Sequence, residues 1–210
     1  MDKITPLTTD ALVVVDVQND FMEGGALAVP KGNEVVPVVN KLALCFANIM
    51  LTQDWHPPWH SSFATSQLNK RPFEKIMLPY GEQTLWPEHC VQGTKGAELH
   101  AALSLPHTQL IIRKGYRWNV DSYSAFAEAD GTQTGLTGYL RERGIKRLFF
   151  VGLATDFCVA WSAMDARKAG FGAVVIEDAC RAINLDDSLA KAWESMGNAG
   201  VGRVHSSDIV

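Results

Sequence analysis

The chain has 210 residues, of which 47% are hydrophobic, and a net charge of −4 with acidic and basic residues interspersed. This composition predicts one globular domain over residues 1–210, and the charge argues against a protein that binds nucleic acid or an anionic membrane. No apolar stretch approaches the roughly 20 residues that span a bilayer. The first residues lack a signal-peptide pattern and the four cysteines form no CxxC pair, so a cytoplasmic protein without a disulfide framework is expected.

The predicted elements alternate between strands and helices. In chain order they are a strand at 11–17, a helix at 33–48, strands at 48–53 and 109–114, a helix at 135–145, a strand at 147–152, a helix at 157–170, a strand at 172–178, a helix at 188–200 and a short last strand at 201–207. The strands are short runs rich in β-branched residues, and the helices carry apolar residues at helical spacing. Strand alternating with helix predicts an α/β protein with a mostly parallel sheet between helices.

Residues 54–108 form a long segment with little periodicity and with five prolines between Pro57 and Pro87. Long irregular segments of compact domains are usually functional or disordered. This segment keeps three tryptophans together with His56, His60 and His89. We therefore expect a functional loop rather than disorder.

Reactive side chains fall at the ends of the predicted strands. Asp16 ends the first strand, Asp54 and His56 follow the second, Lys114 ends the third and Cys158 follows the fourth. Ligands of open parallel sheets bind beyond the carboxyl ends of the strands. The sequence therefore predicts one site that contains all of these side chains.

Cys158 has two interpretations. Free cysteines are among the most buried residues, which favours a small core residue. Alternatively, Thr155 or Asp156 caps the following helix, and Cys158 lies in its first turn, where free N–H groups favour a thiolate or bind an oxyanion. Lys114 would lower the pKa of the thiol, and Asp16 could accept its proton. Asp16 could instead cap a turn and Lys114 could be solvated, although a buried carboxylate needs a partner.

The segment after the second strand also offers a metal site. Asp54 and His56 alternate along the chain, and His89 could add a third ligand. Two imidazoles and a carboxylate suit Zn²⁺, Fe²⁺ or Mn²⁺, although an Asp-x-His spacing is common and is weak evidence by itself. His60 is either a fourth ligand or a residue that supports the ligands from behind.

Five segments together resemble a known family. They are VVVDVQNDFMEGGALAV (13–29), QDWHPPWHSSFA (53–64), LWPEHCVQGTKGAE (85–98), RKGYRWNVDSYSAF (113–126) and VGLATDFCVAWSAMDA (151–166). In this order they resemble the isochorismatase-like cysteine hydrolases, and within that family most closely the nicotinamidase (pyrazinamidase) branch. The resemblance runs from the first strand to about Asp178.

The resemblance implies a three-layer α-β-α fold with a six-stranded, mostly parallel sheet. It implies a nucleophile, a general base and a cation, namely Cys158, Asp16 and Lys114. It also implies one divalent metal ion, Zn²⁺ or Fe²⁺ with Mn²⁺ as a further candidate, held by Asp54, His56 and His89. The implied pocket residues are Phe21, Trp86, Tyr123 and Leu153. An oxyanion hole would be formed by the backbone N–H groups of Ala154 and Cys158, after a cis peptide bond between Leu153 and Ala154.

The activity that the resemblance implies is hydrolysis of nicotinamide to nicotinate and ammonia through a cysteine thioester, in NAD salvage, and hydrolysis of pyrazinamide as well. The expected partner is a small molecule, and assembly into a homo-oligomer is left open. Two alternatives share the fold. One is hydrolysis of a carbamoyl or ureido compound, by enzymes that generally lack the metal ligands, and the other is vinyl-ether cleavage by isochorismatase, which does not use the cysteine. A non-catalytic metal-binding module is the alternative from another class.

Overall fold

The computed structural model describes residues 3–210 of the chain. A π-helical turn at Thr155–Val159 connects the strand β6 (Arg147–Leu153) to the helix α3 (Ala160–Lys168). In chain order the strands and helices are β1 (Asp10–Val15), α1 (Val35–Ala43), β2 (Ile49–Asp54), β3 (Lys75–Leu78), β4 (Gly81–Thr84), β5 (Leu110–Lys114), α2 (Leu136–Glu142), β6 (Arg147–Leu153), α3 (Ala160–Lys168), β7 (Gly172–Arg181), α4 (Ser188–Asn198) and β8 (Gly202–Val204).

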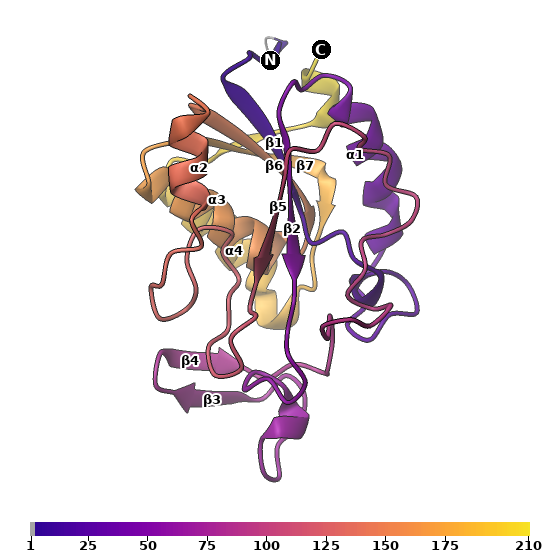
Figure 1. The fold of residues 1–210 in the computed structure, drawn as a ribbon, viewed down its shortest axis with the longest axis vertical. Helices are drawn as coiled ribbons and strands as arrows, with labels where there is room; N and C mark the ends of the chain where they lie inside the picture. The colour runs from indigo at the N-terminus through magenta and orange to yellow at the C-terminus, as the bar shows by residue number, and fades with distance from the viewer. Residues whose placement is uncertain (1–2) are drawn as a thin grey trace.

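Six strands form the main sheet, in the order β5-β2-β1-β6-β7-β8, and each pair of neighbours is parallel. The order of strands reverses direction between β1 and β6, which is where open α/β sheets bind their ligands. Figure 1 shows α1 on one side of the sheet and α2, α3 and α4 on the other. The predicted α/β fold with a mostly parallel sheet is therefore confirmed, as is the three-layer α-β-α arrangement that the family resemblance implied.

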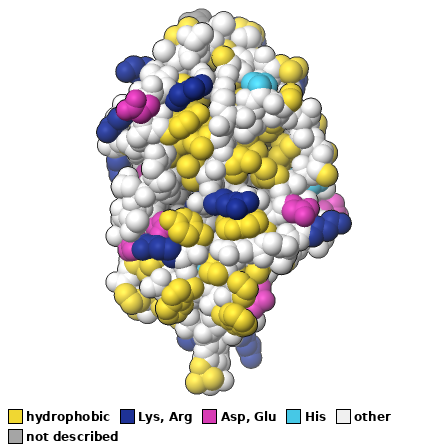
Figure 2. Space-filling view, in the orientation of Figure 1, with side chains coloured by type: hydrophobic (Ala, Val, Ile, Leu, Met, Phe, Trp, Pro, Cys, Tyr) yellow, Lys and Arg dark blue, Asp and Glu magenta, His cyan; other side chains and the backbone are white. Residues whose placement is uncertain are grey.

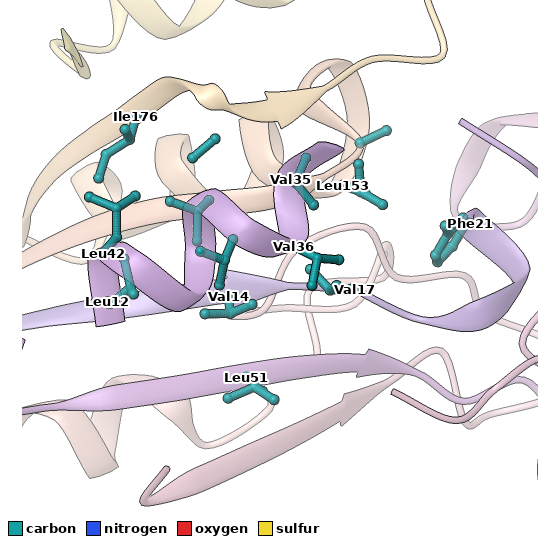
Figure 3. Packing of buried hydrophobic residues seen from close by; sticks show 14 of the residues in the cluster. Leu12, Val14, Val17, Phe21, Val35, Val36, Leu42, Leu51, Leu153 and Ile176 are labelled. Atoms are coloured by element: carbon teal, nitrogen blue, oxygen red, sulfur yellow. The ribbon is translucent and has the colours of Figure 1, made fainter. Parts of the chain in front are cut away.

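Both faces of the sheet are buried. Successive side chains of a strand point to opposite faces, and all six residues of β1 are buried. Leu12 and Val14 belong to the hydrophobic cluster on the α1 side, whereas Val13 and Val15 belong to the cluster under α2, α3 and α4. A strand buried on both faces is apolar throughout rather than at alternate positions, which is why β1 was recognisable from its sequence. Figure 3 shows the α1 side of this core, including Val35, Val36 and Leu42.

The first helix and the segment at 54–108 differ from the prediction. The helix predicted at 33–48 ends at Ala43, and the apolar pattern continues only because Phe46 packs into the core from the turn before β2. Within residues 54–108, the antiparallel pair β3 and β4 forms a hairpin apart from the main sheet (Figure 1). The hairpin escaped prediction because its residues are largely polar or exposed, with Met77 74% exposed, so no buried apolar face marks it.

The surface carries charges of both signs. Acidic and basic side chains are mixed over the face seen in Figure 2, with hydrophobic side chains between them. Among the exposed hydrophobic residues is Ile111 on β5, an edge strand of the main sheet. Within residues 3–210, no helix is long and apolar enough to cross a membrane.

Candidate active site

Reactive side chains from four adjacent strands converge at one edge of the sheet. Asp54 and Lys114 end β2 and β5, and they lie side by side in the register of these strands. Asp16 follows β1 directly, with a φ of 47°, and Cys158 lies in the π-helical turn after β6. Because β5, β2, β1 and β6 are consecutive in the sheet, each of them contributes one group to the same place.

Lys114 is the fully buried centre of this group. Its Nζ lies 2.8 Å from Asp16 Oδ2, donates to Asp54 Oδ1, and lies 3.2 Å from Cys158 Sγ. The carbonyl oxygen of Ser122 accepts a further bond at 3.2 Å. Burial disfavours the ammonium form, but the two carboxylates outweigh it and hold the pKa of Lys114 well above its usual value. Lys114 therefore stays charged and holds both carboxylates beside the thiol.

Asp16 is a buried carboxyl with a raised pKa. Burial is the main cause, opposed by Lys114 and by a hydrogen bond from Thr52. The Thr52 hydroxyl donates to Asp16 Oδ1 at 2.5 Å and accepts the Asp16 backbone N–H at 3.1 Å, which fixes the orientation of the carboxyl. A carboxylate whose pKa is raised is a stronger proton acceptor than an ordinary aspartate. Asp16 therefore has the position and the basicity of a general base.

The Cys158 thiol is buried beside Lys114, and these two surroundings act on its pKa in opposite directions. Burial raises the pKa of the thiol well above its usual value, and Lys114 lowers it by less. The sulfur and a carboxylate oxygen from each of Asp16 and Asp54 lie within 4.8 Å of one another. Asp16 therefore lies within reach of the thiol proton.

The turn that carries Cys158 differs from the predicted capped helix. Ala154 occupies the capping position, and no side chain caps the turn. The carboxylate of Asp156 instead accepts hydrogen bonds from the backbone N–H groups of Ile183 and Asn184 at 3.1 and 2.7 Å, so it secures the loop after β7. The expected cap by Thr155 or Asp156 is therefore wrong. The predicted cis peptide bond between Leu153 and Ala154 is present.

Asp54, His56 and His89 form a group with the chemistry of a metal site. Asp54 Oδ2 lies 3.6 Å from His56 Nε2 and 3.7 Å from His89 Nε2. The Nδ1 atoms of the two histidines point to backbone carbonyls, of Gly115 at 2.9 Å and of Pro87 at 2.8 Å, so Nδ1 carries the proton in each ring. Both Nε2 lone pairs therefore face the Asp54 oxygen, as ligands of a divalent cation would.

The position of the His56 ring depends on the absence of a side chain at Gly115. Gly115 has a φ of +64°, and a Cβ there would lie 2.5 Å from Cε1 of His56. The glycine lets its carbonyl approach the ring closely enough to accept the Nδ1 proton. The turn after β5 thus orients a residue that follows β2.

His60 lies beside this group with both ring nitrogens engaged. Its ring centroid is 4.4 Å from that of His56. His60 Nε2 donates to the carbonyl of Val120 at 3.1 Å, and Nδ1 accepts from the Ser62 hydroxyl at 2.7 Å. Burial lowers the pKa of His60 to about 4, with His56 adding to the effect. His56, His60 and Asp121 form a second cluster of possible metal donors. However, both ring nitrogens of the neutral His60 are hydrogen-bonded, so His60 packs against His56 without offering a nitrogen to a metal.

We expect His60→Gln to bind added zinc as the wild type does, because His60 has no free nitrogen to give to a metal. His89→Ala should lose zinc affinity by more than the about 10- to 100-fold that follows loss of an outer hydrogen-bond partner. Zinc binding to both purified variants, measured against a competing chelator, checks the difference. Equal loss of zinc from the two variants would make His60 a fourth ligand.

A pocket lies against Cys158 and the group of Asp54, His56 and His89. Phe21, Trp86 and Tyr123 line it, as predicted for pocket residues. Leu153 does not line it, because its buried side chain packs in the core on the α1 side, close to Val35 in Figure 3. Aromatic walls with a few polar groups at one end suit a small planar ring that carries a polar substituent.

Four lining residues were not predicted: Leu27, Asp121, Phe157 and Ile183. Phe157 meets Trp86 edge-on with ring centroids 5.0 Å apart, and its place next to Cys158 in the chain was a usable signal. Leu27 and Ile183 come from loops that only the folded chain brings to the pocket. Their apolar side chains carry no sequence signal of their own.

The β3–β4 hairpin supports one wall of the pocket. Gln83 of β4 is buried and its Nε2 donates to Asp121 Oδ2 at 2.7 Å and to the Tyr123 hydroxyl at 3.3 Å. The Trp86 Nε1–H donates to the same hydroxyl at 3.0 Å. The hairpin therefore fixes the Tyr123 ring from outside the main sheet.

An isochorismatase domain model matches residues 10–208 of the chain. The chain therefore belongs to the isochorismatase domain family. Among curated proteins, it is 59% identical over 201 residues to a nicotinamidase of Acinetobacter baylyi, covering 95% of this chain and 94% of the relative. It is 43% identical over 196 residues to a nicotinamidase of Escherichia coli, covering 90% and 92%.

Solved structures of similar proteins share the fold. An Acinetobacter baumanii nicotinamidase/pyrazinamidase matches with a TM-score of 0.95 and 58% identity, covering 96% of this chain and 98% of that one. PnC1 from L. infantum in complex with nicotinate matches with a TM-score of 0.88 and 39% identity, covering 100% of this chain and 99% of that one. A Pyrococcus horikoshii pyrazinamidase in complex with zinc matches with a TM-score of 0.77 and 38% identity, covering 94% of this chain and 99% of that one.

Proposed function

We propose that the chain is a metal-dependent amidohydrolase that converts nicotinamide to nicotinate and ammonia, and acts on pyrazinamide as well, in NAD salvage. The observation that carries the proposal is that a thiol site and a potential metal site meet in one pocket with aromatic walls. A buried thiol lies 3.2 Å from Lys114 Nζ, and beside it Asp54 faces His56 and His89. The nicotinamidase relatives, one of them with bound nicotinate, support the same substrate.

The chain's own residues supply the covalent chemistry. Asp16 takes the proton of the Cys158 thiol, and the sulfur attacks the carboxamide carbon. The backbone N–H groups of Ala154 and Cys158 hold the oxyanion. Asp16 returns the proton to the departing ammonia and leaves a thioester on Cys158. Asp16 then takes a proton from water, whose oxygen attacks the thioester carbon. The C–S bond breaks, Asp16 returns the proton to the departing sulfur, and the nicotinic acid loses its own proton to the released ammonia, which leaves nicotinate and the free thiol.

The pocket orients the substrate for this attack. Phe21, Trp86 and Tyr123 pack on the pyridine ring, and Lys114 keeps Asp16 beside the sulfur. Asp54, His56 and His89 would hold one divalent ion, for which we propose Zn²⁺ or Fe²⁺, with Mn²⁺ as a further candidate. Such an ion, when bound, supplies an electrophilic contact for the ring nitrogen.

The wider organisation of the protein is also a proposal. We propose one domain over residues 1–210, a small-molecule substrate as the partner, and a cytoplasmic location. Binding of nucleic acid or of a membrane is not expected, and a homo-oligomer stays a prediction. The mixed charges on the face in Figure 2 support the expectation that the protein does not bind nucleic acid.

A coupled ammonia-release assay tests the function. Purified enzyme should release ammonia from nicotinamide and from pyrazinamide, lose this activity on treatment with a chelator, and regain it with added metal. Carbamoyl and ureido compounds are the control substrates, because the metal-ligand set argues against them. Release from these compounds but not from nicotinamide would replace the proposal with the other amidase activity. No ammonia from any of them would favour isochorismatase-type cleavage or a binding module.

A further inference from the structure

The strand β1 leaves the sheet before its neighbour β2 ends. The register of β1 with β2 runs to Val14 and Leu51, and Asp16 turns the chain away with a φ of 47°. On the side of β2 that faces β1, residues Thr52–Asp54 therefore extend beyond the last paired residue of β1. These are the positions that present Asp54 to Lys114 and to the metal-binding histidines.

The side chain of Gln18 takes the place of the missing strand. Its Oε1 accepts the backbone N–H of Asp54 at 2.8 Å, and its Nε2 donates to the backbone carbonyl of Asp54 at 2.8 Å. The N–H and C=O of an extended residue point to the same side, so one amide can pair with both as a neighbouring strand would. Gln18 is fully buried, so water does not compete for these bonds.

The same amide reaches a third segment. Gln18 Nε2 also donates to the carbonyl of Ala97 at 2.9 Å, in the loop that follows His89. This loop pairs with the turn after β1, since the N–H of Asn19 donates to the carbonyl of Glu98 at 3.0 Å. Gln18 therefore joins the turn that carries Asp16, the end of β2 and the loop beyond His89.

We propose that Gln18 is a positioning residue of the active site, and the inference rests on the proposed function for its catalytic part. By fixing both backbone groups of Asp54, its amide sets the direction of a carboxylate with two tasks. Asp54 Oδ1 accepts from Lys114, and Oδ2 faces the Nε2 atoms of His56 and His89. Rotation of the Asp54 backbone would break both contacts together, which couples metal binding to the placement of Lys114.

The test compares Gln18→Glu with Gln53→Glu. The first variant keeps an acceptor for the Asp54 N–H but sets an oxygen against the carbonyls of Asp54 and Ala97. Gln53 is the matched control, because its Nε2 donates to the same Ala97 carbonyl at 2.8 Å and its Oε1 accepts from Arg113 at 3.1 Å, without a side-chain bond to Asp54. Gln18→Met removes the bonds without adding charge, and serves if the glutamate variant does not fold.

We expect the Gln18 variants to bind zinc about 10- to 100-fold more weakly than the wild type, and to lose kcat by a similar factor. Gln53→Glu should match the wild type in both. Zinc affinity is measured by competition with a chelator on folded protein, checked by circular dichroism. Wild-type zinc affinity in a folded Gln18 variant, or equal loss in the Gln53 control, would overturn the proposal. The zinc measurement needs no substrate, so it stands even if nicotinamide is not hydrolysed.

Discussion

Replacing Cys158 with alanine is expected to reduce kcat for ammonia release from nicotinamide by about 10⁴-fold or more. The sulfur supplies the electron pair that attacks the carboxamide, and a methyl group supplies none. The thiol takes no part in the group of Asp54, His56 and His89, so the variant should fold and bind zinc like the wild type. Initial rates of ammonia release, with metal content and circular dichroism on the same sample, check the expectation.

Cys180→Ala is the matched control for this variant. Cys180 is also a buried free cysteine, 4% exposed against 6% for Cys158, but it lies on β7 away from the pocket described above. The Cys180 variant should keep its rate of ammonia release. If the Cys158 variant released ammonia at a comparable rate, Cys158 would not be the nucleophile.

Replacing Lys114 with methionine is expected to lower the free energy of unfolding by about 3–5 kcal/mol, because it leaves buried carboxylates without their cation. Asp16 and Asp54 both contact its ammonium group. Activity should fall as well. Lys114 lowers the pKa of Asp16, so its loss raises that pKa, and Asp16 stays protonated up to a higher pH. The acid limb of the rate profile should therefore move to higher pH.

Urea unfolding of the metal-free protein measures the loss of stability, because a metal bound to Asp54 would mask part of it. Lys75→Met is the control. Lys75 pairs with Glu82 in the exposed hairpin, at 2.8 Å, with both side chains more than half exposed, and such surface pairs contribute little. If both variants unfolded at the same urea concentration, Lys114 would not be the electrostatic centre of the site.

The sequence predicted those parts of the fold and site that depend on buried strands. Asp16, Asp54 and Lys114 could be placed because each follows or ends a short apolar run, and parallel strands bring their carboxyl ends to one edge. The end of α1 could not be predicted, because Phe46 is buried from a turn and continues the apolar pattern of α1. The β3–β4 hairpin lacked a buried apolar face and left no pattern to find.

Properties that depend on contacts distant in the sequence could not be predicted. Asp156 was expected to cap a helix, but its carboxylate binds the loop after β7, 27 and 28 residues away in the chain. Lys114 lowers the pKa of Cys158 as expected, but burial, which the sequence could not measure, outweighs it and raises that pKa. The hydrogen bond of His60 Nε2 likewise depends on Val120, which the sequence could not place beside it.

Changes in the β3–β4 hairpin can alter which substrate the pocket accepts without altering the reaction. Gln83 reaches the pocket wall through Asp121 and Tyr123, whereas Asp16, Lys114 and Cys158 are fixed by the main sheet and the turn after it. In evolution, insertions or exchanges in β3 and β4 would reshape the space around a substrate ring and leave the reacting atoms in register. Diversity among family members is therefore expected to concentrate in this hairpin, and a laboratory search for enzymes with new amide substrates should begin there.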